Sequence, residues 1–531
     1  MKKLLITTLI MGFAVMLSAQ DYGNYTQITG RAQALKNKYP DKVQLTSLAK
    51  TTTGKDIWVL TLGKGETAKH PAIAIVGGVD GRHLLGVEMA IGVAEKLLAQ
   101  QDIDDILAKN TYYIFPNVQP DATEQYFAPL RYERRLNAKA TDNDRDGTTG
   151  EDPYEDLNGD KMITKVRVLS PKGNYIESSV DPRALFPADP SKGEVGKYLF
   201  ISEGIDNDKD GLFNEDGEGG VDFNKNFTFM YRYFHPEAGE WQISEIETRA
   251  VADFLYDAFN VHSVVSFGLH NNISKASKVF MTTASGVGRE NSEDTKIYGF
   301  VSSLYNKHVP DIANTSALPA EGGEFYTWAY QHYGRYSFVT PAWWATSKER
   351  EVADNYVLTY LKWAEANNVT DIFVPWAPIN HPDFPDGGAE VGGIKPHVMY
   401  NPPFSMVSKL SDEHTAFLKE LTKAAPQLSI EGFKKETLDK DISRVTLTIR
   451  NNGVMPTLNQ IGARSYYLKY ITVQLKFASG QSLIQGNAKV THPVLNGGES
   501  TEFTWLIKGS GKLGVEAGTP TAGYKTSEVT L

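Results

Sequence analysis

Short apolar segments alternate with amphipathic helical patterns from about residue 22 to residue 374, and this alternation limits the fold more than any other feature of the chain. The apolar run AIAIV (72–76) precedes a helical pattern at 86–100 whose apolar residues fall on one face. Farther along, SEIETRAVADFLYDAF (244–259) precedes VHSVVSFGLH (261–270), a β-branched run that ends in a histidine. The alternation predicts an α/β domain in which helices pack on a largely parallel sheet.

The C-terminal segment from about 428 to 531 follows a different pattern, with a period of two. Apolar and polar residues alternate at 445–450, 471–477 and 503–507, and the turn sequences NNG, ASG, NGG and GSG separate such runs. Strands of this spacing predict an all-β, immunoglobulin-like sandwich. Because the segment carries no chemical motif, we expect it to have an accessory or packing role.

Composition excludes one class of partner for the chain as a whole. With 531 residues and 41% hydrophobic content, the chain is long and apolar enough for roughly two to four globular domains. Its formal net charge of -10 leaves no overall basic footprint for nucleic acid. We therefore expect no nucleic-acid partner.

The N-terminal sequence MKKLLITTLIMGFAVMLSAQ has the pattern of an export signal. Two lysines precede an apolar stretch, and small residues follow at Ser18 and Ala19. The stretch is shorter than the roughly 20 residues that span a bilayer, so we expect a signal peptide at 1–19 rather than a membrane anchor. The sequence contains no cysteine to carry a lipid. Export predicts a periplasmic or extracellular protein without a membrane anchor once the signal is removed.

An acidic insert from about 138 to 219 interrupts the α/β pattern and contains a short repeat. DNDRDGTTGED (142–152) and DNDKDGLFNED (206–216) place oxygen ligands on alternate residues before a glycine, as a hard cation such as calcium requires. The loops are not regular EF-hands, because Pro153 and Gly217 occupy the twelfth position. Solvated acidic loops are the alternative. The candidate calcium ligands are Asp142, Asp144, Asp146, Asp206, Asp208 and Asp210.

Three candidate metal ligands lie where predicted strands end. Asp80 and His83 follow the run at 72–76, and His270 ends the run at 261–270. Strand ends of this kind hold ligands in open α/β sheets, and two imidazoles with one carboxylate are a common ligand set of catalytic zinc. Taken alone, a turn aspartate and two ordinary polar histidines are the more usual explanation of the three residues. Zinc at this place is a hypothesis.

Several ordered blocks of sequence resemble the zinc carboxypeptidase family of metallopeptidases, over about residues 22–376. The resemblance implies one α/β domain with a mixed sheet, a zinc ion, and hydrolysis of C-terminal residues from peptides. It also implies that Asp80, His83 and His270 occupy the metal-ligand positions. The blocks are GKDIWVLTLG (54–63), GGVDGRHLLGVE (77–88), GGVDFNKNF (219–227), SEIETRAV (244–251), FGLH (267–270) and YGRYSFVTP (333–341).

Two departures from the family's pattern concern catalysis. Asp80 and His83 stand where the family has histidine and glutamate, so carboxylate and imidazole have exchanged places. The family's general-base glutamate corresponds to Pro341, which has no ionisable group. Since general acid–base catalysis contributes about 10²- to 10⁴-fold, the resemblance predicts impaired hydrolysis. Glu321 and Glu324 are candidate substitute bases, and solvent-facing loop acids are the more ordinary explanation for both.

Residues that hold the substrate in the family are partly retained. Asn224 matches the asparagine that binds the substrate's terminal carboxylate, and Lys225 replaces its partner arginine. Lysine keeps the charge but loses the two-pronged geometry, so carboxylate recognition is predicted to weaken. Arg134 or Arg135, in RYERRLN (131–137), corresponds to the oxyanion-stabilising arginine, with a surface arginine as the alternative for either.

Two functions follow from these observations. The first is an exported relative with impaired hydrolysis that binds zinc and peptides or other ligands with a free carboxylate. The second is an active metallocarboxypeptidase with a permuted Asp/His/His zinc site and a substitute base. A calcium-loaded structural protein is a third alternative. The expected organisation is a signal peptide at 1–19, a zinc-carboxypeptidase-like domain at 22–375 with the insert at 138–219, a connector at 376–427 and the sandwich at 428–531.

Overall fold

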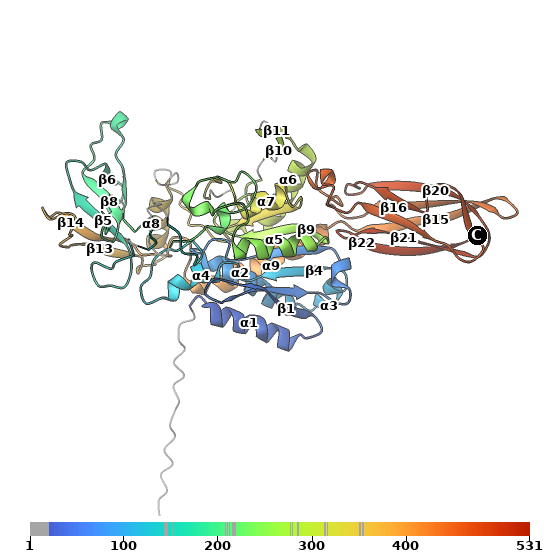
Figure 1. Ribbon diagram of the computed structural model, residues 1–531, viewed down its shortest axis with the longest axis horizontal. Coiled ribbons are helices and arrows are strands. Elements are labelled where there is room, and N and C mark those ends of the chain that lie inside the picture. Colours follow the sequence, from blue (N-terminus) through green and yellow to red (C-terminus); the bar gives the residue numbers. More distant parts are fainter. Residues whose placement is uncertain are drawn as a thin grey trace, which may run out of the picture.

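Figure 1 shows the structure, a computed structural model of the chain. The predicted signal peptide at 1–19 lies outside the described residues. Within the described part of the chain, no helix combines the length and the apolar character that crossing a bilayer needs. The described residues are 21–142, 147–150, 152–207, 209, 211, 213–214, 219–276, 278, 280–283, 286–312, 315, 317–349, 352 and 355–531.

A six-stranded mixed sheet forms the centre of the main domain (Figure 1). Its strands, in spatial order, are β1 (Val43–Lys50), β2 (Asp56–Leu62), β4 (Thr111–Phe115), β3 (Ala72–Val76), β9 (Val261–Phe267) and β12 (Tyr336–Thr340). The last four are parallel, whereas β1 and β2 pair antiparallel. Every residue of β3, β9 and β12 is buried, as expected for strands that are covered on both faces. The sheet confirms the predicted α/β fold.

Helices cover both faces of this sheet and bury two apolar cores. Side chains alternate along a strand, so Ile73 and Ile75 of β3 lie in one core while Ala74 and Val76 lie in the other. In the second core, α5 (Ile246–Asp257) and α7 (Phe325–Gln331) pack on the sheet. The helices that contribute to the first core are α1 (Tyr25–Lys38), α2 (Leu84–Leu98), α3 (Ile103–Leu107), α6 (Ser292–His308), α8 (Tyr356–Ala366) and α9 (Val407–Ala424).

A second sheet, which we call the inserted sheet, combines two segments that are far apart in the sequence. In spatial order it contains β13 (Phe373–Pro378), β14 (Ala389–Ile394), β5 (Lys165–Leu169), β8 (Tyr198–Ser202), β6 (Tyr175–Glu177) and β7 (Leu185–Pro187). All neighbours are antiparallel, and Val166 opposite Val391 belongs to a small apolar core. The predicted acidic insert and the predicted connector thus share one sheet, and α9 from the connector packs on α2.

The C-terminal segment forms two four-stranded antiparallel sheets that share one apolar core. This confirms the all-β prediction, while an immunoglobulin-like topology stays a prediction. Figure 1 shows these sheets at one end of the molecule and the inserted sheet at the other. The strands are β15 (Leu428–Asp439), β16 (Ile442–Asn451), β20 (Ser500–Lys508) and β18 (Ser482–Gln485) in one sheet, and β19 (Lys489–His492), β17 (Ile471–Lys476), β21 (Lys512–Thr519) and β22 (Gly523–Thr530) in the other.

Three short elements complete the described fold. They are α4 (Pro120–Thr123) and the paired strands β10 (Phe280–Thr283) and β11 (Gly286–Glu290).

The predicted calcium loops lie only partly within the described residues. The Asp142 carboxylate accepts a hydrogen bond from the Gly147 N–H at 3.0 Å. In the second loop, Asp206 accepts one from the Gly211 N–H, also at 3.0 Å. The two loops therefore form the same kind of local turn. Calcium binding stays a prediction. The candidates outside the described residues are Asp144, Asp146, Asp208 and Asp210.

Candidate functional site

The residues singled out from the sequence lie at one edge of the central sheet, where three parallel strands end. Asp80 follows β3, His270 follows β9 and Pro341 follows β12, while His83 immediately precedes α2. Neighbouring parallel strands end at the same edge, which is where open α/β sheets hold their ligands. The fold thus brings the four positions to one edge. There the side chains of Asp80, His83 and His270 have their own hydrogen-bond partners, and Pro341 takes part through its carbonyl.

Asp80 is bonded to an internal cation. Its side chain is buried, and the Arg82 guanidinium contacts both carboxylate oxygens, with Nε 3.0 Å from Oδ1 and Nη2 2.7 Å from Oδ2. The Arg82 backbone N–H donates a further bond to Oδ1 at 3.0 Å. Burial alone would raise the pKa of Asp80, but the charge and hydrogen bonds of Arg82 hold it well below its usual range. Asp80 is therefore ionised, and both of its carboxylate oxygens are hydrogen-bonded to Arg82.

His83 lies in the protein interior. Its side chain is completely buried, and Nε2 lies 3.1 Å from the Pro341 carbonyl oxygen. A carbonyl only accepts, so Nε2 carries the proton and donates it. Burial lowers the pKa of His83 to about 4, which keeps the ring neutral at neutral pH. The other ring nitrogen, Nδ1, has no hydrogen-bond partner among the described residues.

His270 stands at the end of β9 and is half-buried. Its Nδ1 lies 2.9 Å from the Leu318 carbonyl oxygen, so Nδ1 donates and Nε2 is left as an acceptor. The ring is tilted against Tyr326, with 5.3 Å between the centroids. These contacts fix the orientation of the imidazole without help from Asp80 or His83.

The residues present do not fit a zinc ion. Within the described residues, no group of three or more His, Cys, Asp or Glu side chains is arranged to hold a metal. The positive charge next to Asp80 is supplied by Arg82. The structure does not bring Asp80, His83 and His270 together as a metal centre. The physical reason is that both oxygens of the Asp80 carboxylate are already bonded to Arg82.

Asn224 and Lys225 are also engaged within the protein. The Asn224 amide donates from Nδ2 to the Val79 carbonyl at 2.6 Å and accepts from the Phe325 N–H at 3.3 Å. Lys225 pairs with the carboxylate of Glu237. Asn224 therefore ties two backbone segments together, which is a structural use of the side chain predicted to bind a substrate carboxylate.

Arg134 and Arg135 have different surroundings. Arg134 is buried and donates to two backbone carbonyls, Leu136 at 3.0 Å and Asn137 at 2.7 Å. Arg135 forms an ion pair with Glu237, the carboxylate that also binds Lys225. Sequence reasoning missed Glu237, because it lies about a hundred residues from Arg135 and in no recognised motif. The Glu237 carboxylate binds both Lys225, which was predicted to bind a ligand carboxylate, and Arg135, a candidate for the oxyanion-stabilising arginine.

Asp222 is a second residue that the sequence did not reveal. Its carboxylate caps a short turn by accepting the Asn224 N–H at 2.8 Å, and its Oδ2 lies 3.7 Å from Arg135 Nε. Burial, followed by the negative charge of Asp80, raises the pKa of Asp222 to about 7. The site therefore holds one carboxylate that is ionised at all ordinary pH values and one that titrates near neutrality.

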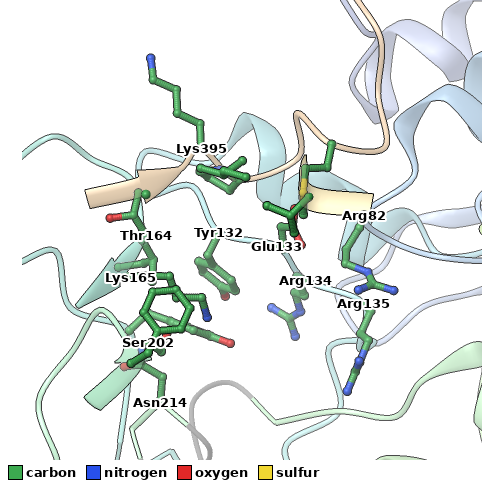
Figure 2. A pocket seen from close by; sticks show the side chains of 18 of the residues that line it. Arg82, Tyr132, Glu133, Arg134, Arg135, Thr164, Lys165, Ser202, Asn214 and Lys395 are labelled. Carbon is green, nitrogen blue, oxygen red and sulfur yellow. Dashed lines mark hydrogen bonds between the residues drawn. The ribbon is translucent and has the colours of Figure 1, made fainter. Parts of the chain in front are cut away.

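A cavity of about 460 Å³ lies beside these residues, between the main domain and the inserted sheet. Figure 2 shows Arg82, Arg134 and Arg135 on one side and Lys165 and Ser202 on the other. A lining with more cations than acids suits the binding of an anion. Among the described lining residues, the cations are Arg82, Arg134, Arg135, Lys165, Arg183 and Lys395, and the acids are Glu133 and Glu237.

Two family models match parts of the chain. The model of the family described as zinc carboxypeptidase matches residues 28–165, and a domain of unknown function (DUF8731) matches residues 427–530. Carboxypeptidase B of Astacus astacus is 26% identical over 119 residues, which are 22% of this chain. The chain spans 39% of the length of that curated relative.

Solved structures of carboxypeptidases resemble the chain at low identity. Bovine thrombin-activatable fibrinolysis inhibitor, in complex with tick carboxypeptidase inhibitor, gives a TM-score of 0.42 and 14% identity over 76% of this chain and 96% of that chain. Carboxypeptidase A from Helicoverpa armigera gives 0.38 and 14% over 66% and 72% of the two chains. Over residues 28–165, which lie in the domain built on the mixed α/β sheet, the chain is thus similar to the zinc carboxypeptidase family.

Proposed function

We propose that this protein is an exported member of the zinc carboxypeptidase family that binds ligands through a free carboxylate and has lost zinc-dependent peptide hydrolysis. One observation carries the proposal: both carboxylate oxygens of Asp80 are bonded to Arg82, inside the segment that corresponds to the family's metal ligands. The N-terminal sequence pattern supports export.

The position of the general base supports the same conclusion. Pro341 cannot remove a proton from water, and its carbonyl already accepts the His83 proton. Without a base, hydrolysis loses roughly 10²- to 10⁴-fold of its rate, apart from any loss caused by a missing metal. In this proposal the ion lacks a free carboxylate ligand, because Asp80 is bonded to Arg82. The base position lacks an ionisable side chain, because it is occupied by Pro341.

The two nearby glutamates do not replace the base. Glu324 is buried, and its Oε1 accepts the Gly322 N–H at 2.6 Å, in the turn that precedes α7. Glu321 is exposed and lies 3.5 Å from the Lys225 ammonium. One carboxylate is thus committed to the backbone and the other is held by a lysine, so neither is placed as a free base.

Carboxylate recognition is the part of the family's chemistry that these residues still support. Arg135 and Lys225 converge on the single carboxylate of Glu237, and together they lower the pKa of Glu237 despite its burial. Two cations that share one carboxylate have the charge and the spacing needed to bind the carboxylate of a ligand. A ligand carboxylate binds here either by displacing Glu237 or by using the arginines of the adjacent cavity.

Metal content and turnover test the loss of hydrolysis. The mature protein, purified without added zinc, is expected to contain no stoichiometric zinc by elemental mass spectrometry. It is also expected to release no C-terminal residue from a peptide mixture followed by liquid chromatography and mass spectrometry. Stoichiometric zinc, together with release that stops on adding a chelator and in His270→Ala, would establish the active alternative instead.

Ligand binding tests the retained recognition separately. By isothermal calorimetry, peptides with a free terminal carboxylate are expected to bind more tightly than the same peptides with an amidated end. The matched variant is Arg135→Gln, which removes one of the two cations at Glu237. If acid and amide bind equally well, the protein does not recognise the carboxylate and this function is wrong.

A further inference from the structure

The wall of the cavity that faces the arginines belongs to the inserted sheet. Lys165 begins β5, Ser202 ends β8 and Gly393 lies on β14, and all three line the cavity. The family match covers residues 28–165, so most of this wall lies beyond the matched part of the chain. The cavity is therefore partly built by segments that the family resemblance does not explain.

Most charged groups around the cavity are already paired. Arg82, Arg183 and Lys395 each pair with an aspartate outside the lining. Glu133 accepts the His397 backbone N–H at 2.9 Å. These pairs make the lining locally neutral at several points, so the remaining charge of Lys165 bears most on which ligand charge fits.

Three lining side chains end in hydrogen-bond donors that have no partner among the described residues. The Lys165 side chain is exposed, and its ammonium forms no ion pair or hydrogen bond with them. The hydroxyl of Tyr132, whose side chain is only 5% exposed, and the indole N–H of Trp376 are buried without an acceptor. Buried donors are nearly always bonded in folded proteins. The two buried donors call for a ligand that supplies acceptors, and Lys165 adds an exposed positive charge to the same cavity.

An aromatic surface lies next to these donors. The rings of Tyr132 and Tyr154 are stacked, with 3.9 Å between their centroids, and both line the cavity. Figure 2 shows Tyr132 between Lys165 on one side and Arg134 on the other. A flat apolar group can therefore pack on this pair while acidic groups reach the cations on either side.

We propose that this cavity binds a short peptide whose C-terminal residue carries an acidic side chain. The terminal carboxylate faces the arginine side at Arg135, the acidic side chain faces Lys165 and Tyr132, and an apolar residue packs on the tyrosine pair. The volume of about 460 Å³ lies in the range of small-ligand sites. Recognition of the terminal carboxylate rests on the proposed function, whereas selection of the acidic side chain is new and depends on the inserted sheet.

Four tripeptides separate the two ideas. Gly-Phe-Glu and Gly-Phe-Gln, each with a free and with an amidated end, are titrated into the full mature chain by isothermal calorimetry. With free ends, the glutamate peptide is expected to bind about tenfold more tightly than the glutamine peptide, the effect of one charge-assisted hydrogen bond. The preference should weaken at high salt, because partly exposed charges are screened.

Lysine variants locate the preference. Lys165→Gln is expected to abolish the preference for glutamate over glutamine. Lys192→Gln is expected to keep it, since Lys192 is an exposed residue of the same insert that pairs with Asp189. Tyr132→Phe should reduce the preference in part. Melting temperatures close to that of the unchanged protein establish that each variant is folded.

The outcomes distinguish the failure of each proposal. If glutamate and glutamine peptides bind equally, or if the preference survives Lys165→Gln, the acidic-peptide site is wrong even when free ends bind better than amidated ends. If free and amidated ends bind equally, the proposed carboxylate recognition is wrong. If none of the four peptides binds at millimolar concentration, both proposals are wrong.

Discussion

A buried carboxylate needs a counter-charge, and Asp80 finds one two residues along the chain. The Arg82 guanidinium meets both oxygens in a two-pronged pair, and both side chains are largely shielded from water. Charges removed from water are stable only as a pair with good geometry. Asp80, which the family resemblance predicts to be a metal ligand, thus forms half of an internal ion pair.

Breaking this pair from one side should be costly. Arg82→Gln leaves Asp80 as an unpaired buried carboxylate, so we expect the free energy of unfolding to fall by about 3 kcal/mol. Denaturant unfolding at neutral pH measures the change. The double variant Asp80→Asn/Arg82→Gln should recover most of the loss, because it removes the charge as well. A double variant no more stable than the single one would contradict this account.

Asp222 should give the protein a pH-dependent stability. Its folded-state pKa is about 7, against an ordinary value of 3.8, so between these values the folded protein holds a proton that the unfolded chain has released. The free energy of unfolding therefore falls as pH rises through this window, by at most about 1.4 kcal/mol per pH unit from this group. Above the folded-state pKa the contribution is constant.

The variant Asp222→Asn isolates this effect. Asparagine can still accept the Asn224 N–H but cannot ionise. The melting temperature of the variant relative to the unchanged protein should rise from pH 4 to about pH 7 and then level off. A difference that stays flat across this range would show that Asp222 keeps an ordinary pKa.

At the scale of elements, a short 3-10 helix positions the Glu237 carboxylate beside its two cations. Glu237 lies in η5 (Pro236–Ala238), and its carboxylate binds Arg135 and Lys225. If Glu237 competes with ligands, Glu237→Gln should raise the affinity for Gly-Phe-Gln with a free end about tenfold, as measured by calorimetry. Glu240→Gln, which alters a more exposed ion pair with Lys139, is the matched control. Unchanged affinity in Glu237→Gln would mean that Glu237 only organises the cations.

The acidic loops carry a separate prediction. Asp142 and Asp206 accept equivalent backbone N–H bonds, and a bound calcium ion would stabilise the folded state by mass action. Calcium at a hundred times its dissociation constant should add about 2.7 kcal/mol to the free energy of unfolding, seen as a higher melting temperature that a chelator reverses. Asp142→Asn with Asp206→Asn should remove the increase. The absence of both heat and a melting shift would exclude a calcium site.

The sequence predicted the elements better than the contacts between them. The runs at β3, β9 and β12 were visible because strands buried on both faces are continuously apolar, and the period of two exposed the C-terminal sheets. The partner of Arg135 was not visible, because folding brings Glu237 to it from a distant segment. The pairing of β5 with β14 was hidden for the same reason, and their cross-strand pair Arg167–Glu390 is separated by 223 residues.

The sequence motif did not reveal the internal partners of the candidate site's side chains. Family resemblance located Asp80, His83 and Pro341 at one sheet edge, but packing decides what each binds. Arg82, which no motif singled out, neutralises Asp80, and burial holds His83 against a backbone carbonyl. A sequence pattern records the position of a residue along the chain, whereas charge pairing and burial depend on neighbours from every part of the fold.

At the scale of the whole molecule, three bodies of structure succeed one another along its length (Figure 1). The central domain carries the paired charges, the inserted sheet supplies the second wall of the cavity, and the C-terminal sheets lie at the far end. Peptide selection, if located in the cavity, is therefore a property of the central domain and the inserted sheet together. We expect it to be indifferent to substitutions in the C-terminal sheets.

Strand β5 lies between β14 and β8 and forms backbone hydrogen bonds with both. The stretch that contains β5 and β8 and the distant stretch that contains β14 therefore pair within one sheet. A chain with residues 138–219 but without residues 373–394 would leave a bare strand edge, which invites pairing with another molecule. The two stretches are thus expected to be gained or lost in evolution as a single unit, and homologues with only one of them should be rare.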